Sequence, residues 1–406
     1  MQSFGRFVVI NLRWIAAGFL LTFFSSVGQT FFIALSNAEI RSAFALSNGG
    51  FGGLYMIATL CSAATLPFMG RLLDRYSTFA VTVGSLIALA AAALALGLVW
   101  SIPSLVFALY LLRLFGQGMM TEIAFTATGR WFAANRGRAV ALATLGQRAG
   151  EGLLPFVFVA VAAAIGWRNA WLAAAVAVLA LALPLIGWLV RRERNPKGEA
   201  SSHEHLSARD WTASEVLRDP KFYAICLGVL APAFIGTTVF FHQVYLTEIK
   251  GWSLQLFAAG FAVMSVTNVF FSLLSGWLID RYSSVRFLPS FLLPMALACF
   301  VVAWMKADWT IFLFMALLGI SYGFSSTLSG AMWPEIYGTR HLGAIRSLVV
   351  SAMVIATAIG PGLTGWLIDI GVDFEFQLAV MGIYSLAAAA LMALVSRRLM
   401  AERVAA

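Results

Sequence analysis

The sequence has little charge and few cysteines. Only 11% of its 406 residues are charged, about half the share of an ordinary soluble domain, so a soluble fold of this length would lack the polar surface to cover its core. The three cysteines, Cys61, Cys226 and Cys299, stand in apolar runs at unrelated spacings, which indicates packing residues and not a disulfide framework or a metal site. No nucleophile–base pattern and no phosphate-binding loop is present, so we expect no metal, no cofactor and no enzymatic activity.

Long apolar runs dominate the chain, which is 61% hydrophobic. Runs of about 20 residues recur, each long enough to cross a hydrocarbon layer of roughly 30 Å. Helices are expected, because lipid cannot satisfy exposed backbone groups. No cleavable signal peptide is expected, since the first run is too long and belongs to a series. The predicted spans lie near residues 14–36, 49–69, 79–99, 104–128, 139–164, 169–190, 221–246, 254–276, 286–305, 309–332, 344–368 and 376–397.

The net charge of +9 is distributed unevenly about these spans. Twenty Lys and Arg fall on the side of the two termini, and only Arg41, Arg168, Lys250 and Lys306 fall on the other. This positive-inside bias predicts a multi-pass protein of the bacterial inner membrane with both termini cytoplasmic, so the basic charge does not indicate nucleic-acid binding. We expect one six-helix bundle over residues 1–190, a cytoplasmic linker over 191–220 and a second bundle over 221–406.

One polar string occurs twice. Gly70-Arg-Leu-Leu-Asp74-Arg75-Tyr-Ser77 is repeated as Gly276-Trp-Leu-Ile-Asp280-Arg281-Tyr-Ser283, 206 positions later, with six of eight residues identical. Each copy lies between two apolar runs, which indicates a duplicated protein. Asp74 and Asp280 could lock against a helix N-terminus or an Arg of the neighbouring bundle and so close the cytoplasmic side. The plain alternative is a polar turn that only directs topology.

Four charged residues lie inside predicted spans: Arg113 and Glu122 in the fourth, and Arg148 and Glu151 in the fifth. Arg148 is expected roughly 15 Å deep, near the bilayer midplane, and Glu151 is close enough to pair with it. Arg113 and Glu122 are nine positions apart and so face opposite ways, whereas Gln117 shares the Arg113 face. Such charges predict a substrate or proton site; an ion pair that joins the fourth span to the fifth is the structural alternative.

Polar stripes at helical spacing follow the first, eighth and tenth spans and include Gln29, Asn268 and Tyr322, respectively. Small hydroxyl residues favour helix packing, but three such stripes fit a water-filled cavity equally well. His242, near the outer end of the seventh span, could carry a proton near neutral pH or be a neutral hydrogen-bonded group. The candidates for substrate or proton binding are therefore Arg113, Gln117, Glu122, Arg148, Glu151, Gln29, Asn268, Tyr322 and His242.

The repeated turn resembles the signature loop of the major facilitator superfamily, and Arg113-x-x-Gly116-x-Gly118 is similar to that superfamily's Arg/Gly motif. The resemblance covers nearly the whole chain. It implies an all-α membrane fold of twelve transmembrane helices, in two six-helix bundles around a central cavity, that works by alternating access. It also implies a cavity or proton-coupling role for Arg113 and a gating role for Gly70, Asp74, Arg75, Gly276, Asp280 and Arg281.

The stretch from Arg130 to Arg168 and the string Phe241-His242 to Lys250-Gly251-Trp252-Ser253 resemble the monocarboxylate and oxalate–formate branch. The chain departs from that branch in the eighth span, where Asn268 and hydroxyls replace the usual cation, and in the first span, which lacks the acidic-glycine motif of the animal members.

We therefore predict a monomeric secondary active transporter of a small, monocarboxylate-like organic anion. Arg113 and Arg148 would attract the anion, and Glu151 or Glu122 would carry a coupled proton. The alternative is proton-driven efflux of drugs or toxic compounds, with the glutamates facing a cationic substrate. The expected partners are the substrate, protons and the lipid bilayer.

Overall fold

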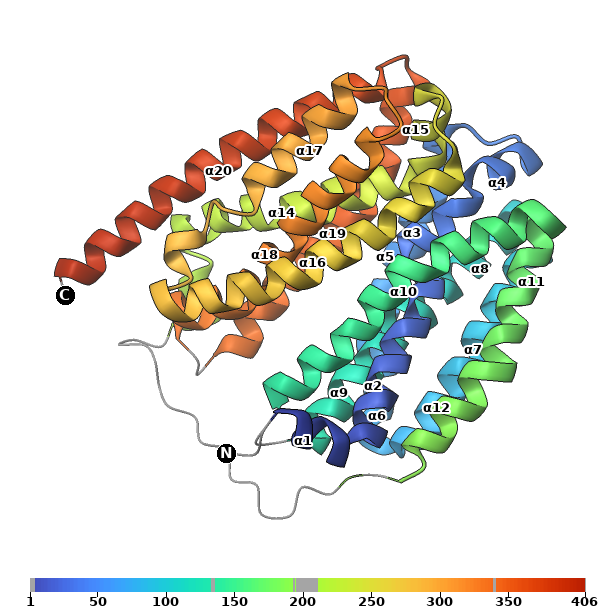
Figure 1. The fold of residues 1–406 in the computed structure, drawn as a ribbon, viewed down its shortest axis with the longest axis horizontal. Helices are drawn as coiled ribbons and strands as arrows, with labels where there is room; N and C mark the ends of the chain where they lie inside the picture. The colour runs from blue at the N-terminus through green and yellow to red at the C-terminus, as the bar shows by residue number, and fades with distance from the viewer. Residues whose placement is uncertain (1–3, 133–135, 193, 195–210, 339–340, 406) are drawn as a thin grey trace. The chain divides into compact units, whose positions relative to one another are not determined.

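The computed structural model describes residues 4–132, 136–192, 194, 211–338 and 341–405. Within these ranges every regular element is a helix (Figure 1). The chain divides into two compact units, one made of Met1–Leu46 with Gly53–Ser202, the other of Ser47–Gly52 with His203–Ala406. Residues 195–210, more than half of the linker expected at 191–220, lie outside the described ranges.

The helices of the first unit begin with a short α1 and end with α12 at the linker. In order they are α1 (Phe4–Ile10), α2 (Leu12–Ser25), η1 (Ser26–Gly28), α3 (Thr30–Ile33), η2 (Ala34–Ser36), α4 (Asn37–Ala43), α5 (Asn48–Gly70), α6 (Leu72–Arg75), α7 (Thr78–Gly97), α8 (Ile102–Leu111), η3 (Leu112–Met120), α9 (Thr121–Trp131), α10 (Arg136–Ile165), α11 (Trp167–Ala177), η4 (Val178–Ala182) and α12 (Leu183–Val190). The start of α5 belongs to the second unit.

The second unit has fewer and longer helices. They are α13 (Ala213–Val216), α14 (Pro220–Phe241), α15 (Gln243–Lys250), α16 (Leu254–Tyr282), η5 (Val285–Phe287), α17 (Leu292–Trp304), α18 (Thr310–Tyr337), α19 (Leu342–Asp369) and α20 (Phe374–Ala405). Within this unit α16 packs along α18, α17 along α20, and α14 along α19.

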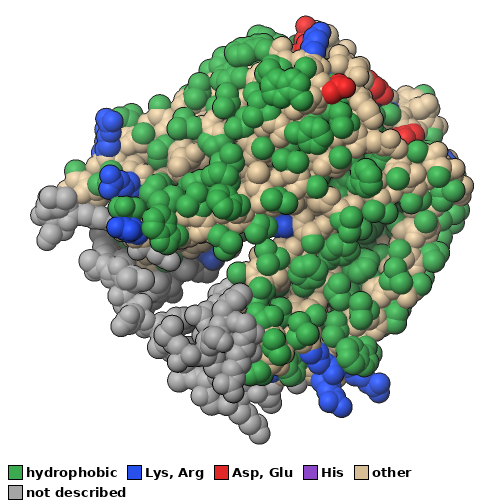
Figure 2. Space-filling model, viewed as in Figure 1, with side chains coloured by type: hydrophobic (Ala, Val, Ile, Leu, Met, Phe, Trp, Pro, Cys, Tyr) green, Lys and Arg blue, Asp and Glu red, His purple; other side chains and the backbone are tan. Residues whose placement is uncertain are grey.

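Eleven helices in the described ranges are long and apolar enough to cross a membrane, and the bent pair Leu12–Gly28 and Thr30–Ala43 makes a twelfth. Large apolar side chains cover their outer surfaces, and Figure 2 shows hydrophobic side chains over most of the visible face. Trp100 and Trp304 are exposed at helix ends, where tryptophan is favoured at a membrane–water interface. The prediction of an all-α, multi-pass membrane fold is confirmed.

Four spans are less regular than the apolar runs predict, and one of them, the sixth, contains the π-helix η4. The first is bent by 45° at Gln29, whose backbone is extended (φ −81°, ψ 152°) between η1 and α3. The fourth contains a π-helix, η3, a rare element that is frequent at functional sites. The seventh ends as a regular helix at Phe241, and α15 resumes after His242.

The first span is held tightly between two other helices of its unit. A Cβ atom on Gly28 or Gly116 would come closer than 3.0 Å to the backbone of the other segment, so η1 and η3 cross in backbone contact. On another side of the first span, a Cβ on Gly146 or Gly150 of α10 would meet Phe19 or Ser26 just as closely. The position of the bend at Gln29 is therefore fixed by two glycine contacts.

We predict that Gly116→Ala destabilises the protein by about 1–3 kcal/mol, because the added methyl group must push η3 away from η1. Thermal unfolding in detergent measures the effect, with loss of the monodisperse size-exclusion peak as the signal. Gly84→Ala is the matched control, since a Cβ at Gly84 meets no atom within 4 Å. Equal unfolding midpoints for the two variants would contradict the backbone contact.

Candidate functional site

Arg113 lies on the π-helix η3 and is buried, with 5% of its surface exposed. One guanidinium nitrogen donates to Thr30 Oγ1 at 3.2 Å, and the hydroxyl of Tyr55 donates to the same oxygen at 2.7 Å. The guanidinium carbon lies 5.5 Å from the centre of the Tyr55 ring. A guanidinium has five N–H donors, and among the described residues only the neutral Thr30 hydroxyl accepts from it. A buried cation in this state is suited to bind an anion.

Two further polar groups belong to the helices that surround Arg113. Gln117, one turn along η3, has an amide oxygen that is buried and accepts no hydrogen bond from the described part of the chain. Gln29, 8% exposed, occupies the bend of the first span immediately before Thr30. The bend and the π-helix, both departures from regular α-helix, therefore meet at the Arg113 side chain.

The Arg148 and Glu151 side chains pair within α10. Arg148 Nη1 lies 2.8 Å from Glu151 Oε2, with 25% of the arginine side chain exposed and 8% of the glutamate. The first span contacts α10 through Ser26, next to Gly150, and the Ser26 hydroxyl has no hydrogen-bond partner among the described groups. Among the described residues, the Arg148–Glu151 ion pair therefore lies within the fifth span and does not join that span to the fourth.

Glu122 lies apart from these groups. Its side chain is exposed on α9, and Thr126 Oγ1 donates to its carboxylate at 3.2 Å. Of the two glutamates proposed from the sequence, Glu151 is therefore the one that is buried and paired with a cation. Among the described residues, no three His, Cys, Asp or Glu side chains are grouped to hold a metal ion.

The second-unit candidates lie at helix contacts. Asn268 is buried against α18 beside Gly323, and its amide nitrogen donates to no described group. The Tyr322 hydroxyl donates to Pro232 O at 3.4 Å. His242 is fully buried, 3.1 Å from Pro361 O and edge-on to Phe374. A buried imidazole with a backbone carbonyl and an aromatic ring as neighbours resembles a core histidine.

The two copies of the repeated string are held in place differently. In the first, Arg130 donates to Leu73 O at 2.7 Å, and Ser77 caps α7 by accepting from Ala80 N at 3.2 Å. In the second, Ser283 has a left-handed backbone (φ 83°), which is costly for a serine. The Glu335 carboxylate accepts from Ser283 Oγ at 2.5 Å and from Ser284 N at 2.9 Å. These hydrogen bonds fix the second turn.

The structure describes the gating candidates only in part. Arg75 and Arg281 are exposed, and the side chains of Asp74 and Asp280 lie outside what the structure describes. A Cβ on Gly70 would meet no atom within 4 Å, and one on Gly276 would meet only Thr327, at 3.8 Å. Packing in this conformation therefore does not require glycine at either position.

Sequence reasoning missed Thr30, Tyr55 and Glu335. Thr30 and Tyr55 look like ordinary span residues, although Thr30 directly follows Gln29 in a polar stripe. Glu335 lies at the end of α18, 52 positions from the serine it holds. Short-range spacing indicates none of these contacts.

Comparisons with known proteins agree with this architecture. The family model described as Major Facilitator Superfamily matches residues 18–308 and 234–404. The oxalate:formate antiporter of Oxalobacter formigenes is 23% identical over 82% of this chain and 76% of its own length. Two solved structures share the fold. One is a bacterial homologue of the human lysosomal transporter Spinster in an inward-facing, unoccupied conformation, with a TM-score of 0.72 and 18% identity over 95% of this chain and 96% of the other. The other is the nucleoside transporter NupG, with a TM-score of 0.71 and 12% identity over 95% of this chain and 98% of the other. The chain belongs to the major facilitator superfamily.

Proposed function

We propose that this secondary transporter moves a small organic anion and that Arg113 binds it. The observation that carries the proposal is the burial of this cation with one hydrogen bond to a neutral hydroxyl. A carboxylate offers the paired acceptors that the remaining guanidinium donors lack. The similarity to an oxalate:formate antiporter supports the same substrate class.

Arg148 and Glu151 supply the coupling step in this proposal. While Glu151 is ionised, Arg148 is paired with it at 2.8 Å. When Glu151 takes up a proton, the pair is lost and the charge of Arg148 becomes available to an arriving anion. Anion and proton would then be bound together and released together.

The efflux alternative is less well supported. A cationic substrate needs a carboxylate that is both buried and available, and the Glu151 carboxylate is occupied by Arg148. Glu122 is exposed and accepts from Thr126. The proposed orientation places both termini and the repeated turns in the cytoplasm of a bacterial cell, as the Lys and Arg distribution predicts.

We predict that Arg113→Leu weakens anion binding by about 30-fold or more, equivalent to about 2 kcal/mol, because the carboxylate loses its buried cation. Counterflow of radiolabelled oxalate, formate and related carboxylates in proteoliposomes measures transport, and thermal shift with the same panel measures binding. Full transport by the variant would refute the assignment, and sensitivity of a deletion strain to cationic drugs without any anion counterflow would favour efflux.

The same variant separates binding from folding. Removing Arg113 leaves the Tyr55 hydroxyl paired with Thr30, so the ligand-free variant should unfold at or above the wild-type temperature. Arg148→Leu should lower stability by about 1–3 kcal/mol, since it leaves the Glu151 carboxylate buried without its partner. Marked destabilisation by Arg113→Leu would mean that the guanidinium is structural.

We predict that Glu151→Gln uncouples the anion from the proton. The neutral side chain mimics the protonated state, so anion exchange should continue while accumulation driven by a pH gradient is lost. Anion uptake into proteoliposomes without an imposed pH gradient measures exchange, and uptake with the gradient measures accumulation. Glu122→Gln is the matched control, because Glu122 is exposed and contacts Thr126 instead of an arginine. This variant should retain gradient-driven uptake. Loss of gradient-driven uptake in Glu122→Gln but not in Glu151→Gln would assign the proton to Glu122.

We predict that Gly70→Ala slows transport about ten-fold, equivalent to about 1.4 kcal/mol in the barrier, with anion affinity changed no more than a few-fold. The reason is that the described conformation has room for the methyl group, so its cost would arise only in the other conformation of the transport cycle. Gly84→Ala, which also has room, should transport normally. Unchanged turnover in Gly70→Ala would remove this residue from the gate.

A further inference from the structure

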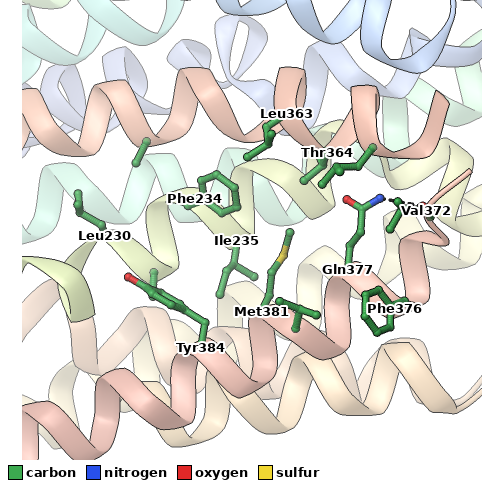
Figure 3. Close-up of a pocket in the computed structure, with 14 residues that line it drawn as sticks. Leu230, Phe234, Ile235, Leu363, Thr364, Val372, Phe376, Gln377, Met381 and Tyr384 are labelled. Atoms are coloured by element: carbon green, nitrogen blue, oxygen red, sulfur yellow. Dashed lines mark hydrogen bonds between the residues drawn. The ribbon is translucent and has the colours of Figure 1, made fainter. Parts of the chain in front are cut away.

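The second unit contains an apolar cavity of about 660 Å³ between α14, α19 and α20 (Figure 3). This volume lies within the roughly 300–1,000 Å³ of sites that hold small molecules. Phe234 and Ile235 of α14 face Leu363 of α19 and Met381 of α20 across it. The cavity lies wholly within the second unit and is separate from Arg113 and Arg148.

The cavity opens to the outer surface of the helices. Among its lining residues Leu363, Phe376 and Val380 are 43%, 62% and 46% exposed, and Tyr384 is 39% exposed. In a multi-pass membrane protein, apolar side chains exposed in this way contact acyl chains. The bilayer is therefore the source of its occupant.

One end of the cavity has a polar group that needs a donor. Gln377 is 5% exposed, and its amide nitrogen donates to Val372 O at 3.0 Å. Its amide oxygen points away from Val372 toward the cavity (Figure 3) and accepts no hydrogen bond from the described residues. The Thr364 and Tyr384 hydroxyls, also in the lining, already donate to Gly360 O and Leu227 O. An N–H or O–H donor brought to this end of the cavity would satisfy the Gln377 oxygen.

The cavity is polar at one end and apolar along the rest of its length, as a site for a lipid would be. Gln377 lies in the first turns of α20, and the lining continues along the same helix face through Val380, Met381 and Tyr384, over about 10 Å of helix. Beside Gln377, Asp373 is exposed at the end of the unit. Glu375 is paired with Lys250 at 2.5 Å. The local charge at the polar end therefore favours a cationic donor.

We propose that this cavity holds an acyl chain of phosphatidylethanolamine, whose ammonium group donates to Gln377 Oε1 beside Asp373. Phosphatidylcholine carries no N–H or O–H donor and leaves the amide oxygen unsatisfied. Phosphatidylglycerol offers hydroxyl donors but brings a net negative charge to Asp373. The site is independent of the transported anion, because none of its residues belongs to the proposed anion site.

Native mass spectrometry of the purified full chain tests the proposal with the three lipids added separately at equal concentration and with identical acyl chains. The wild-type protein should retain about one more phosphatidylethanolamine than Gln377→Leu, which keeps the side-chain volume but lacks the acceptor. Phosphatidylcholine retention should be the same in both. Gln255→Leu, a change at an exposed glutamine of α16, should retain the wild-type number of phosphatidylethanolamine molecules.

A second variant keeps the test decisive if Gln377→Leu folds poorly. Val380→Trp fills the cavity from the next turn of α20, keeps the Gln377 side chain in the sequence, and should also lose one phosphatidylethanolamine. Equal retention of phosphatidylethanolamine by wild type and Val380→Trp would overturn the proposal. Greater retention of phosphatidylglycerol or phosphatidylcholine by the wild type, lost in Val380→Trp, would also overturn it by showing that another lipid occupies the cavity.

Discussion

The backbone contact between Gly28 and Gly116 is the constraint on which the rest of the first unit depends. It brings η1 against η3, so that the bend at Gln29 directly faces the π-helix that carries Arg113. Thr30, the first residue after the bend, is then within 3.2 Å of the guanidinium. A larger residue at either glycine would separate the two segments. Arg113 would then lose its only described hydrogen bond, and the buried cation would no longer have a fixed position.

The sequence predicted those features that depend on local spacing. Apolar run length sufficed to locate the spans, because crossing lipid sets a minimum number of helical residues. The pairing of Arg148 with Glu151 followed from a spacing of three residues on one helix. Nine positions of helical rotation predict different faces for Glu122 and Arg113, and the structure has Arg113 buried and Glu122 exposed. In each case the answer depended on one helix and its periodicity.

Features that depend on contacts between helices were not predictable. Nothing in the run 14–36 indicates that Gln29 is extended, because the bend requires the glycine contacts with η3 and α10 on either side. The Tyr55 hydroxyl reaches Thr30 across 25 positions, and Glu335 reaches Ser283 across 52. Arg113 was identified as a buried charge, but the neutral partner that leaves its remaining donors open could be found only in three dimensions. That neutral partner distinguishes Arg113 from a member of a structural ion pair and supports the proposed anion site.

The repeated string shows that duplicated sequence does not preserve duplicated chemistry. A cation, Arg130, holds the first copy through a backbone carbonyl, whereas an anion, Glu335, holds the second through two serines, one of them in a strained left-handed conformation. The Glu335 carboxylate accepts from Ser283 and from the backbone of Ser284, so it supports the turn at its strained residue. The sequence candidates in the spans also differ between the units: those of the first include Arg113, which is buried, and the pair Arg148–Glu151, and those of the second are an amide, a hydroxyl and a histidine at helix contacts. The second unit also buries a cation, Lys250, but that cation is paired with Glu375 at 2.5 Å. Among the described groups, Arg113 differs from it because its one hydrogen-bond acceptor is a neutral hydroxyl.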